Sequence, residues 1–256
     1  MREMARSLND QVRSYWEQEP CGTSETITGD SHKGTIEWFE RIEQYRYDLE
    51  PFIHSTAQFT RHHGKKILEI GVGAGTDHLQ WARAGADCYG VDLTDAAIDA
   101  TRTHLSMYGF ESNLRRVDAE VLPFPDASFD LVYSWGVIHH SEKPENIIRE
   151  IKRVLRPGGS FVGMMYHRYS VNTFKMWVRH ALLLGKPWLS FTNVLWNNKE
   201  SIGTKAYSTD ELRDLFAGFK DLHVKPVLTL NDTRRLPLSQ LFPDQWGWFL
   251  TISAMK

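Results

Sequence analysis

The chain has few cysteines, no excess of basic residues and no long apolar run. Cys21 and Cys88 are its two cysteines, which excludes a disulfide framework and a cysteine metal cluster. A net charge of −2 argues against a nucleic-acid partner, because such proteins present a basic surface. No stretch approaches the roughly 20 apolar residues of a membrane-spanning helix. The chain also starts without the apolar core of a signal peptide, so we expect a cytoplasmic protein.

The sequence lacks the residue spacings that metal sites require. The pairs His62-His63 and His139-His140 lack the spacing of zinc ligands, and no cluster of carboxylates and amides for a hard cation can be assembled. We therefore expect no metal site and an activity that survives a chelator. The remaining composition is that of an ordinary globular protein, and 256 residues suit one α/β domain with additions.

The most informative stretch begins with a short apolar run, Ile67–Ile70, that ends at a glycine-rich loop. Such a run is typical of a strand buried on both faces of a parallel sheet. Gly71, Gly73 and Gly75 then alternate with small residues, and glycine allows both a tight turn and the close approach of a ligand to the backbone. The pattern predicts a ligand-binding turn after the first strand.

The residues after the loop extend this pattern. Thr76 or Asp77 can cap a helix over residues 78–84, and a second strand follows over Cys88–Leu93. Asp92 stands near the carboxyl end of that second strand, where it can accept hydrogen bonds from ribose hydroxyls. The order of strand, glycine loop, helix, strand and acid predicts a βαβ unit that binds a nucleotide cofactor.

Two details argue against a dinucleotide. The third glycine comes one residue early, so Thr76 stands where the dinucleotide pattern has glycine. Glu69 stands two residues before the loop, where its carboxylate would repel a pyrophosphate but attract a sulfonium and an α-amino group. Because a glycine loop alone can be an ordinary strand–helix turn, the assignment depends on matches farther along the chain.

Further motifs follow in a fixed order. A third strand, Leu114–Val117, ends at Asp118, and a proline-containing linker spans Leu122–Asp130. A fourth strand, Leu131–Trp135, ends beside the expected switch point of the sheet, where open α/β sheets bind ligands. An apolar-striped helix and the sequence Arg-Pro-Gly-Gly then precede a fifth strand, Ser160–Tyr166.

Together these motifs resemble the class I S-adenosylmethionine-dependent methyltransferases of the type 11 subgroup, closely over residues 65–166 and weakly elsewhere. The resemblance implies an α/β, Rossmann-like sheet of seven strands, mostly parallel, with the last strand antiparallel between the fifth and sixth and helices on both faces. It implies S-adenosyl-L-methionine as cofactor and S-adenosyl-L-homocysteine as product. The cofactor-binding residues that it implies are Glu69, Gly71, Gly73, Gly75, Asp92, Leu93, Asp118, Ala119, Glu120, Ser134 and Trp135.

Two segments are additions to such a domain. Residues 1–64 precede the first strand and predict a helical extension that caps the site, whereas residues 65–256 form the methyltransferase domain. Residues 167–206 lie after the fifth strand as an insertion rich in aromatic and basic side chains, which we interpret as a substrate cover. Tyr45, Arg46 and Tyr47 can either pack the extension onto the sheet or approach the cofactor's carboxylate or the substrate. A loop with Pro237 and Pro243 can also close over the site.

A hydroxyl or amine acceptor must lose a proton during methyl transfer, so a general base is expected. His139 and His140 follow the fourth strand and His167 follows the fifth, and histidine accepts protons near neutral pH. These three are the catalytic candidates, with Tyr166 and Tyr207 weaker ones. The alternative is that the histidines are capping or supporting groups.

The leading hypothesis is methyl transfer to oxygen of a small-molecule acceptor, as in small-molecule biosynthesis. Transfer to nitrogen, carbon or sulfur, or to RNA or protein, stays open. Two alternatives come from other functional classes: a non-catalytic binding module and an NAD-dependent oxidoreductase. We expect no nucleic-acid partner and a monomer or homodimer.

Overall fold

The computed structural model describes residues 7–233 and 243–256. Its centre is a seven-stranded sheet in the order β3-β2-β1-β4-β5-β7-β6. The strands are β1 (Lys66–Ile70), β2 (Asp87–Asp92), β3 (Asn113–Arg116), β4 (Phe129–Trp135), β5 (Leu155–Tyr166), β6 (Lys220–Val227) and β7 (Phe249–Met255). β7 runs antiparallel to both β5 and β6, which confirms the expected last strand. The expected loop at Pro237 lies outside the described residues.

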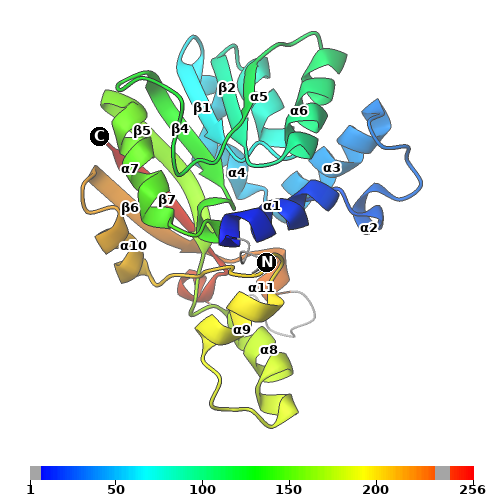
Figure 1. Ribbon diagram of the computed structural model, residues 1–256, viewed down its shortest axis with the longest axis vertical. Helices are drawn as coiled ribbons and strands as arrows, with labels where there is room; N and C mark the ends of the chain where they lie inside the picture. The colour runs from blue at the N-terminus through cyan, green and yellow to red at the C-terminus, as the bar shows by residue number, and fades with distance from the viewer. Residues whose placement is uncertain (1–6, 234–242) are drawn as a thin grey trace, which may run out of the picture.

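Helices cover both faces of the sheet (Figure 1). One face packs against α7 (Pro144–Val154) and α10 (Thr209–Leu215) through side chains such as Ile151 and Leu212. The other face packs against α4 (Phe52–Ala57), η1 (Phe59–His62), α5 (Thr76–Arg83) and α6 (Asp95–Met107). Adjacent strand residues divide between the two cores: Ile67 belongs to one and Leu68 to the other. This division explains why the central strands β1 and β4 are buried at nearly every position.

The expected bounds of the first four strands and of the helix after the glycine loop agree with the structure to within two residues, and two features differ in an instructive way. β5 begins at Leu155 rather than at Ser160, since Leu155 already pairs with Phe129 and the Arg-Pro-Gly-Gly residues bulge out before pairing resumes. The helix after the glycine loop begins at Thr76, and Gly75 is its N-cap without a side-chain hydrogen bond. The prediction that Thr76 or Asp77 caps this helix is therefore wrong, because Asp77 binds other partners described below.

The residues before β1 form the helices α1 (Leu8–Gln18), α2 (Glu25–Thr28) and α3 (Ile36–Leu49), followed by α4 and η1. In Figure 1, α1 and α3 lie across the edge of the sheet at which the parallel strands end. The insertion after β5 forms α8 (Val171–His180), η3 (Leu182–Leu184) and α9 (Phe191–Asn198), which project away from the sheet. The short elements η2 (Ile138–His140), α11 (Leu230–Thr233) and η5 (Asp244–Trp246) complete the described chain.

Candidate active site

The glycine loop lies between β1 and α5, and its three glycines have positive φ values of 84°, 54° and 77°. A Cβ on Gly71 would lie 2.1 Å from a methyl of Val137, and one on Gly75 would lie 3.0 Å from Thr101. These two glycines are therefore needed for close packing of the chain on itself. A Cβ on Gly73 meets nothing within 4 Å, so this residue faces open space. Gly73 is the position where a ligand can approach the backbone.

Asp92 stands at the end of β2, directly beside the glycine loop. One carboxylate oxygen accepts a hydrogen bond from the Gly73 backbone N–H at 3.2 Å. The other accepts from the N–H and the hydroxyl of Thr94 at 3.0 and 2.8 Å. Burial raises the pKa of this carboxyl group, and the hydrogen bonds oppose that shift. The loop and the helix cap thereby hold the Asp92 side chain in one orientation.

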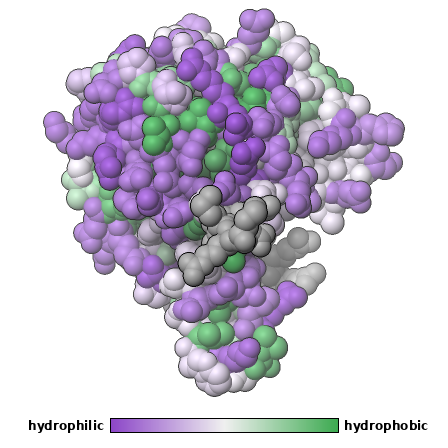
Figure 2. Space-filling view, in the orientation of Figure 1, coloured by the Kyte–Doolittle hydropathy of each residue, from purple (hydrophilic) through white to green (hydrophobic). Residues whose placement is uncertain are grey.

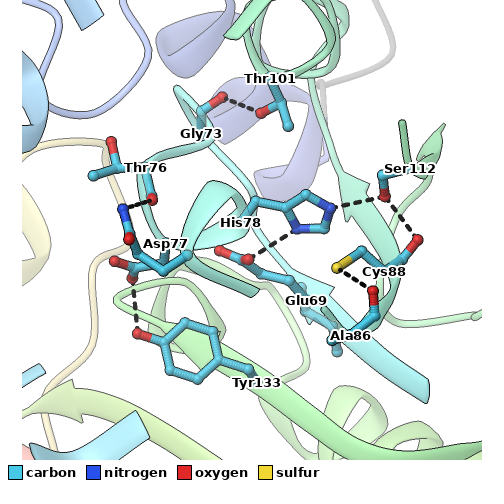
Figure 3. A network of polar contacts seen from close by, with 12 residues as sticks. Glu69, Gly73, Thr76, Asp77, His78, Ala86, Cys88, Thr101, Ser112 and Tyr133 are labelled. Carbon is cyan, nitrogen blue, oxygen red and sulfur yellow. Dashed lines mark hydrogen bonds and ion pairs between the residues drawn. The ribbon is translucent and has the colours of Figure 1, made fainter. Parts of the chain in front are cut away.

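Glu69 lies on β1 with its carboxylate beneath the loop (Figure 3). Its Oε2 atom is 3.0 Å from Nδ1 of His78, and Nε2 of that histidine is 2.8 Å from the Ser112 hydroxyl. Burial raises the pKa of Glu69 well above its usual value and lowers that of His78 to about 4. The low pKa leaves His78 neutral at pH 7. The hydrogen bond between the two side chains holds the Glu69 carboxyl group in position.

Asp77, on the first turn of α5, joins the N-terminal helices to the sheet. Arg46 of α3 donates from Nε to one carboxylate oxygen at 3.0 Å and binds the other through Nη2. The hydroxyls of Tyr47 and Tyr133 also donate to this carboxylate, at 3.0 and 2.7 Å. Burial alone would raise the pKa of Asp77, but Arg46 and the tyrosines lower it overall. Of the aromatic–arginine segment, Tyr45 and Arg46 line the cavity described next.

These elements surround one cavity of about 400 Å³ at the carboxyl ends of β1, β2 and β4. Its volume falls within the range of roughly 300–1,000 Å³ that is usual for small-molecule sites. The predicted cofactor-binding residues that line it are Glu69, Gly71, Gly73, Asp92, Leu93, Asp118, Ala119 and Trp135. Gly75, Glu120 and Ser134 do not line it. Ser134 is buried and donates to the carbonyl of Ile70 at 3.1 Å, which ties β4 to β1.

Helix α1 closes one side of the cavity. The Asn9 side-chain amide donates to the carboxylates of Asp118 and Glu120, at 2.8 Å each, and its oxygen accepts from the Glu142 backbone N–H at 2.8 Å. Near the other end of the helix, Glu17 accepts hydrogen bonds from two backbone N–H groups at the start of α6. The N-terminal extension therefore holds the acids that follow β3, so Glu120 supports the wall of the cavity without lining it.

The three candidate histidines occupy different positions. His140 lines the cavity, whereas His139 and His167 do not. Both ring nitrogens of His139 are buried without a hydrogen-bond partner among the described residues, and burial lowers its pKa well below the usual value. Nδ1 of His167 lies 2.9 Å from the carbonyl oxygen of Gly247, which connects two strand ends. The geometry thus leaves His140 as the histidine that can meet a substrate.

His140 belongs to a polar cluster that sequence reasoning missed. Its Nδ1 is 3.0 Å from the Ser201 hydroxyl, and its Nε2 is 3.5 Å from the Glu200 carboxylate. Tyr166 donates to the same carboxylate at 3.0 Å, and Lys199 forms an ion pair with it. Burial would raise the pKa of Glu200, but Lys199 and His140 together lower it, so this group is ionised at neutral pH.

The backbone of Glu200 has a φ of 53°, a left-handed conformation that is uncommon outside glycine. The residue follows α9 and turns its side chain into the cavity wall. One sequence signal points to it: Glu200 is the first acidic residue after a long segment that has none. Glu50 is a second acid that was missed; it lines the cavity and accepts from the Trp135 indole N–H at 2.7 Å.

The cavity is acidic. Among the described residues, six acidic side chains line it, together with the cationic side chains of Arg46 and Lys199. The carboxylates are Glu50, Glu69, Asp77, Asp92, Asp118 and Glu200. Such a lining attracts a cationic ligand and repels a pyrophosphate. Within the described ranges no group of three potential ligands could hold a metal ion, and no helix there is long and apolar enough to cross a bilayer.

Comparison with known proteins agrees with the fold. Residues 68–163 match the type 11 family model described as a methyltransferase domain. The chain therefore carries a class I S-adenosylmethionine-dependent methyltransferase domain, and S-adenosylmethionine is the cofactor of that family.

Individual relatives are more distant. A fatty-acid O-methyltransferase of Mycolicibacterium smegmatis is 35% identical over 125 residues, covering 48% of this chain and 44% of the relative. A ubiquinone biosynthesis O-methyltransferase of Cereibacter sphaeroides is 28% identical over 189 residues, covering 73% and 68%. Other curated matches also span about half of the relative's length. A methyltransferase structure from Mesorhizobium loti shares the fold, with a TM-score of 0.56, 21% identity and coverage of 76% and 92%.

Proposed function

We propose that the protein is an S-adenosylmethionine-dependent methyltransferase of a small-molecule acceptor, and that it transfers the methyl group to oxygen. The observation that carries the proposal is the acidic cavity beside an open glycine, Gly73. S-adenosylmethionine brings a sulfonium and an ammonium group, whose charges complement such a lining. Two O-methyltransferases among the relatives support transfer to oxygen over transfer to nitrogen, carbon or sulfur.

The residues present fit this cofactor. Asp92 would accept hydrogen bonds from the ribose hydroxyls, since its carboxylate lines the cavity and is held by the loop. Asp118 and Ala119 would contact the adenine, and Asp118 keeps free lone pairs although Asn9 donates to it. Glu69 and the neighbouring loop would lie near the amino-acid portion. Arg46 lines the same region but is committed to Asp77, so it would shape this end of the site.

The sulfonium supplies an already electrophilic methyl group, so the protein's main tasks are to orient the acceptor and to exclude water. Rings from remote segments enclose the cavity on the acceptor side, among them Trp16, Tyr166 and Trp248. His140 would take the proton of an acceptor hydroxyl at Nε2, which is buried without a hydrogen-bond partner among the described residues and which the acceptor would have to uncover as it binds. The ionised Glu200 carboxylate, 3.5 Å away, would stabilise the imidazolium that results.

The cofactor assignment is tested by isothermal titration of the purified protein with S-adenosylmethionine, S-adenosylhomocysteine and NADH. We expect micromolar binding of the first two and none of the third. Binding of NADH alone would contradict the proposal and favour an oxidoreductase. Binding of both sulfur compounds without turnover, in a screen of small hydroxyl, amine and thiol acceptors and of RNA and protein, would favour a non-catalytic module.

The role of His140 is tested once an acceptor is found. We expect His140→Gln to reduce kcat about 100-fold or more with little change in the KM for the cofactor. His139→Gln is the matched control, since that neighbour does not line the cavity. An equal loss in both variants would mean that the histidines act through folding. A cytoplasmic location and a monomeric or homodimeric state stay predictions.

A further inference from the structure

The insertion after β5 ends in an exposed tip. Helices α8 and α9 pack together through Trp177 and Phe191, whose ring centroids lie 6.0 Å apart, and the Trp177 indole donates to the Leu189 carbonyl at 2.7 Å. The pair projects from the body of the protein, and the connection between the two helices forms its far end (Figure 1). The projection is therefore a built structure with its own internal contacts.

The tip, defined as residues 182–188, is exposed at every position. Leu183 and Trp188 are 74% and 76% exposed, and Leu182 and Leu184 are also exposed. Figure 2 shows hydrophobic surface at the lower end of the molecule, where the connection between α8 and α9 lies in Figure 1. Three consecutive exposed leucines and an exposed tryptophan thus lie within seven residues, and exposed apolar side chains gathered in this way are typical of an interaction site.

The charge of the projection differs from that of the whole protein. No Asp or Glu occurs between Arg168 and Lys199, although the chain has a net charge of −2. Arg179 and Lys186 are exposed and lie on either side of the leucines in the sequence. The tip therefore combines aliphatic side chains with an uncompensated positive charge.

The combination of apolar and basic side chains indicates which kind of partner the tip can bind. Leucine side chains cannot stack with bases or hydrogen-bond to them, so RNA would leave these apolar side chains unused. A second copy packed tip to tip would bring the basic residues of both copies together. An anionic bilayer surface suits both features, since leucine and tryptophan enter the headgroup–acyl boundary and basic residues bind the phosphates.

We propose that the tip docks the protein peripherally on an anionic lipid bilayer. Leu183 and Trp188 would enter the interface, and Arg179 and Lys186 would contact lipid headgroups. Helix α9 leads from the tip to Lys199 and Glu200, so one helix connects the docked surface to the wall of the cavity.

The test is co-sedimentation of the full-length protein with sucrose-loaded vesicles. One set contains phosphatidylcholine alone, and the other contains phosphatidylcholine with phosphatidylglycerol, each at low and high salt. We expect the wild type to sediment with the anionic vesicles at low salt and much less with the neutral ones. Leu183→Asp should lower the partition coefficient about tenfold, because an apolar anchor is lost and a like charge is added. Lys186→Ala should lower it about fivefold.

Val121→Asp is the matched control, since Val121 is also 74% exposed but lies far from the tip in the sequence. It should bind vesicles like the wild type, and equal melting temperatures would establish that all variants are folded. Absence of wild-type sedimentation, or equal sedimentation of Leu183→Asp, would overturn the proposal. It would also be overturned if Leu183→Asp abolished a dimer in sedimentation velocity, or an RNA gel shift, while vesicle binding was absent.

Discussion

The cavity has two walls, and they differ in how far apart their residues lie in the sequence. The sheet wall comes from β1, the glycine loop and β2, and Glu69, Gly73 and Asp92 all lie within 24 positions of one another. The cover wall brings together α1, α3 and the segment after α9, so Asn9 and Glu200 meet the same cavity from opposite ends of the chain. The sheet wall holds Glu69 and Asp92 through partners nearby in the sequence, His78, Gly73 and Thr94, whereas the cover wall depends on side-chain pairs across long sequence separations.

This difference teaches which wall tolerates change. Because local hydrogen bonds hold Glu69 and Asp92, we expect the sheet wall to keep its form when distant contacts are lost. The cover wall exists only while its contacts to the sheet hold, and it is the part that can open to admit ligands. The junction between the walls, the sheet wall, the cover wall and the buried His139 can each be tested with one variant.

The largest effect is expected at the junction of the two walls. Arg46→Met would leave the Asp77 carboxylate, 2% exposed, without its cation. Breaking a buried ion pair by removing one partner costs about 3–5 kcal/mol of unfolding free energy. The measurement is urea unfolding. Arg83→Met is the control, because its pair with Glu43 lies nearer the surface and should be worth less than about 1 kcal/mol. Equal losses in the two variants would contradict the importance of the junction.

The sheet wall is tested by Asp92→Ala. We expect S-adenosylmethionine binding to weaken by about 1.5–3 kcal/mol, or roughly 10- to 150-fold, because both ribose hydroxyls lose a charged partner. Titration calorimetry gives the dissociation constant. Asp87→Ala, at the exposed start of the same strand, should bind normally. Unchanged affinity in Asp92→Ala would mean that another acid accepts from the ribose.

The cover wall is tested by Asn9→Ala, which removes the hydrogen bonds from α1 to Asp118 and Glu120. We expect roughly fivefold faster dissociation of the cofactor, corresponding to about 1 kcal/mol, with little change in thermal stability. Stopped-flow displacement by S-adenosylhomocysteine measures the rate. Arg13→Ala on the same helix is the control, since its 3.9 Å contact to Asp95 is at the surface. A rate equal to that of the wild type would show that α1 does not control release.

The smallest effect concerns His139, which is buried between the walls. Because burial lowers its pKa, the unfolded chain binds a proton below about pH 6.5 that folded His139 does not. This residue therefore reduces stability as the pH falls below that value. His139→Phe should make unfolding free energy decline less steeply with acidification, as measured by urea unfolding at a series of pH values. An unchanged slope would show that His139 is protonated within the fold.

Much of the site could be predicted because its signals are local. The spacing of Gly71, Gly73 and Gly75 and the acid after the second strand follow from the geometry of one βαβ unit. The family resemblance implied seven strands with the last one antiparallel between the fifth and sixth, which the structure confirms. The prediction that Thr76 or Asp77 caps α5 was wrong. Asp77 has a side chain of the capping type, but it binds Arg46, which lies 31 positions away in the sequence.

The sequence by itself determined the α/β class of fold and the βαβ unit of the sheet wall, because strand periodicity and turn chemistry act over a few residues. The cofactor followed from the resemblance of its motifs to a known family. Only the tertiary structure distinguished His140 from His139, since adjacent side chains on η2 meet different surroundings. It alone brought Glu200 to Tyr166 and His140, and it alone left Leu183 and Trp188 uncovered at the tip. The burial of a side chain and its hydrogen-bond partners depend on segments distant in the sequence, so they cannot be predicted from residue spacing.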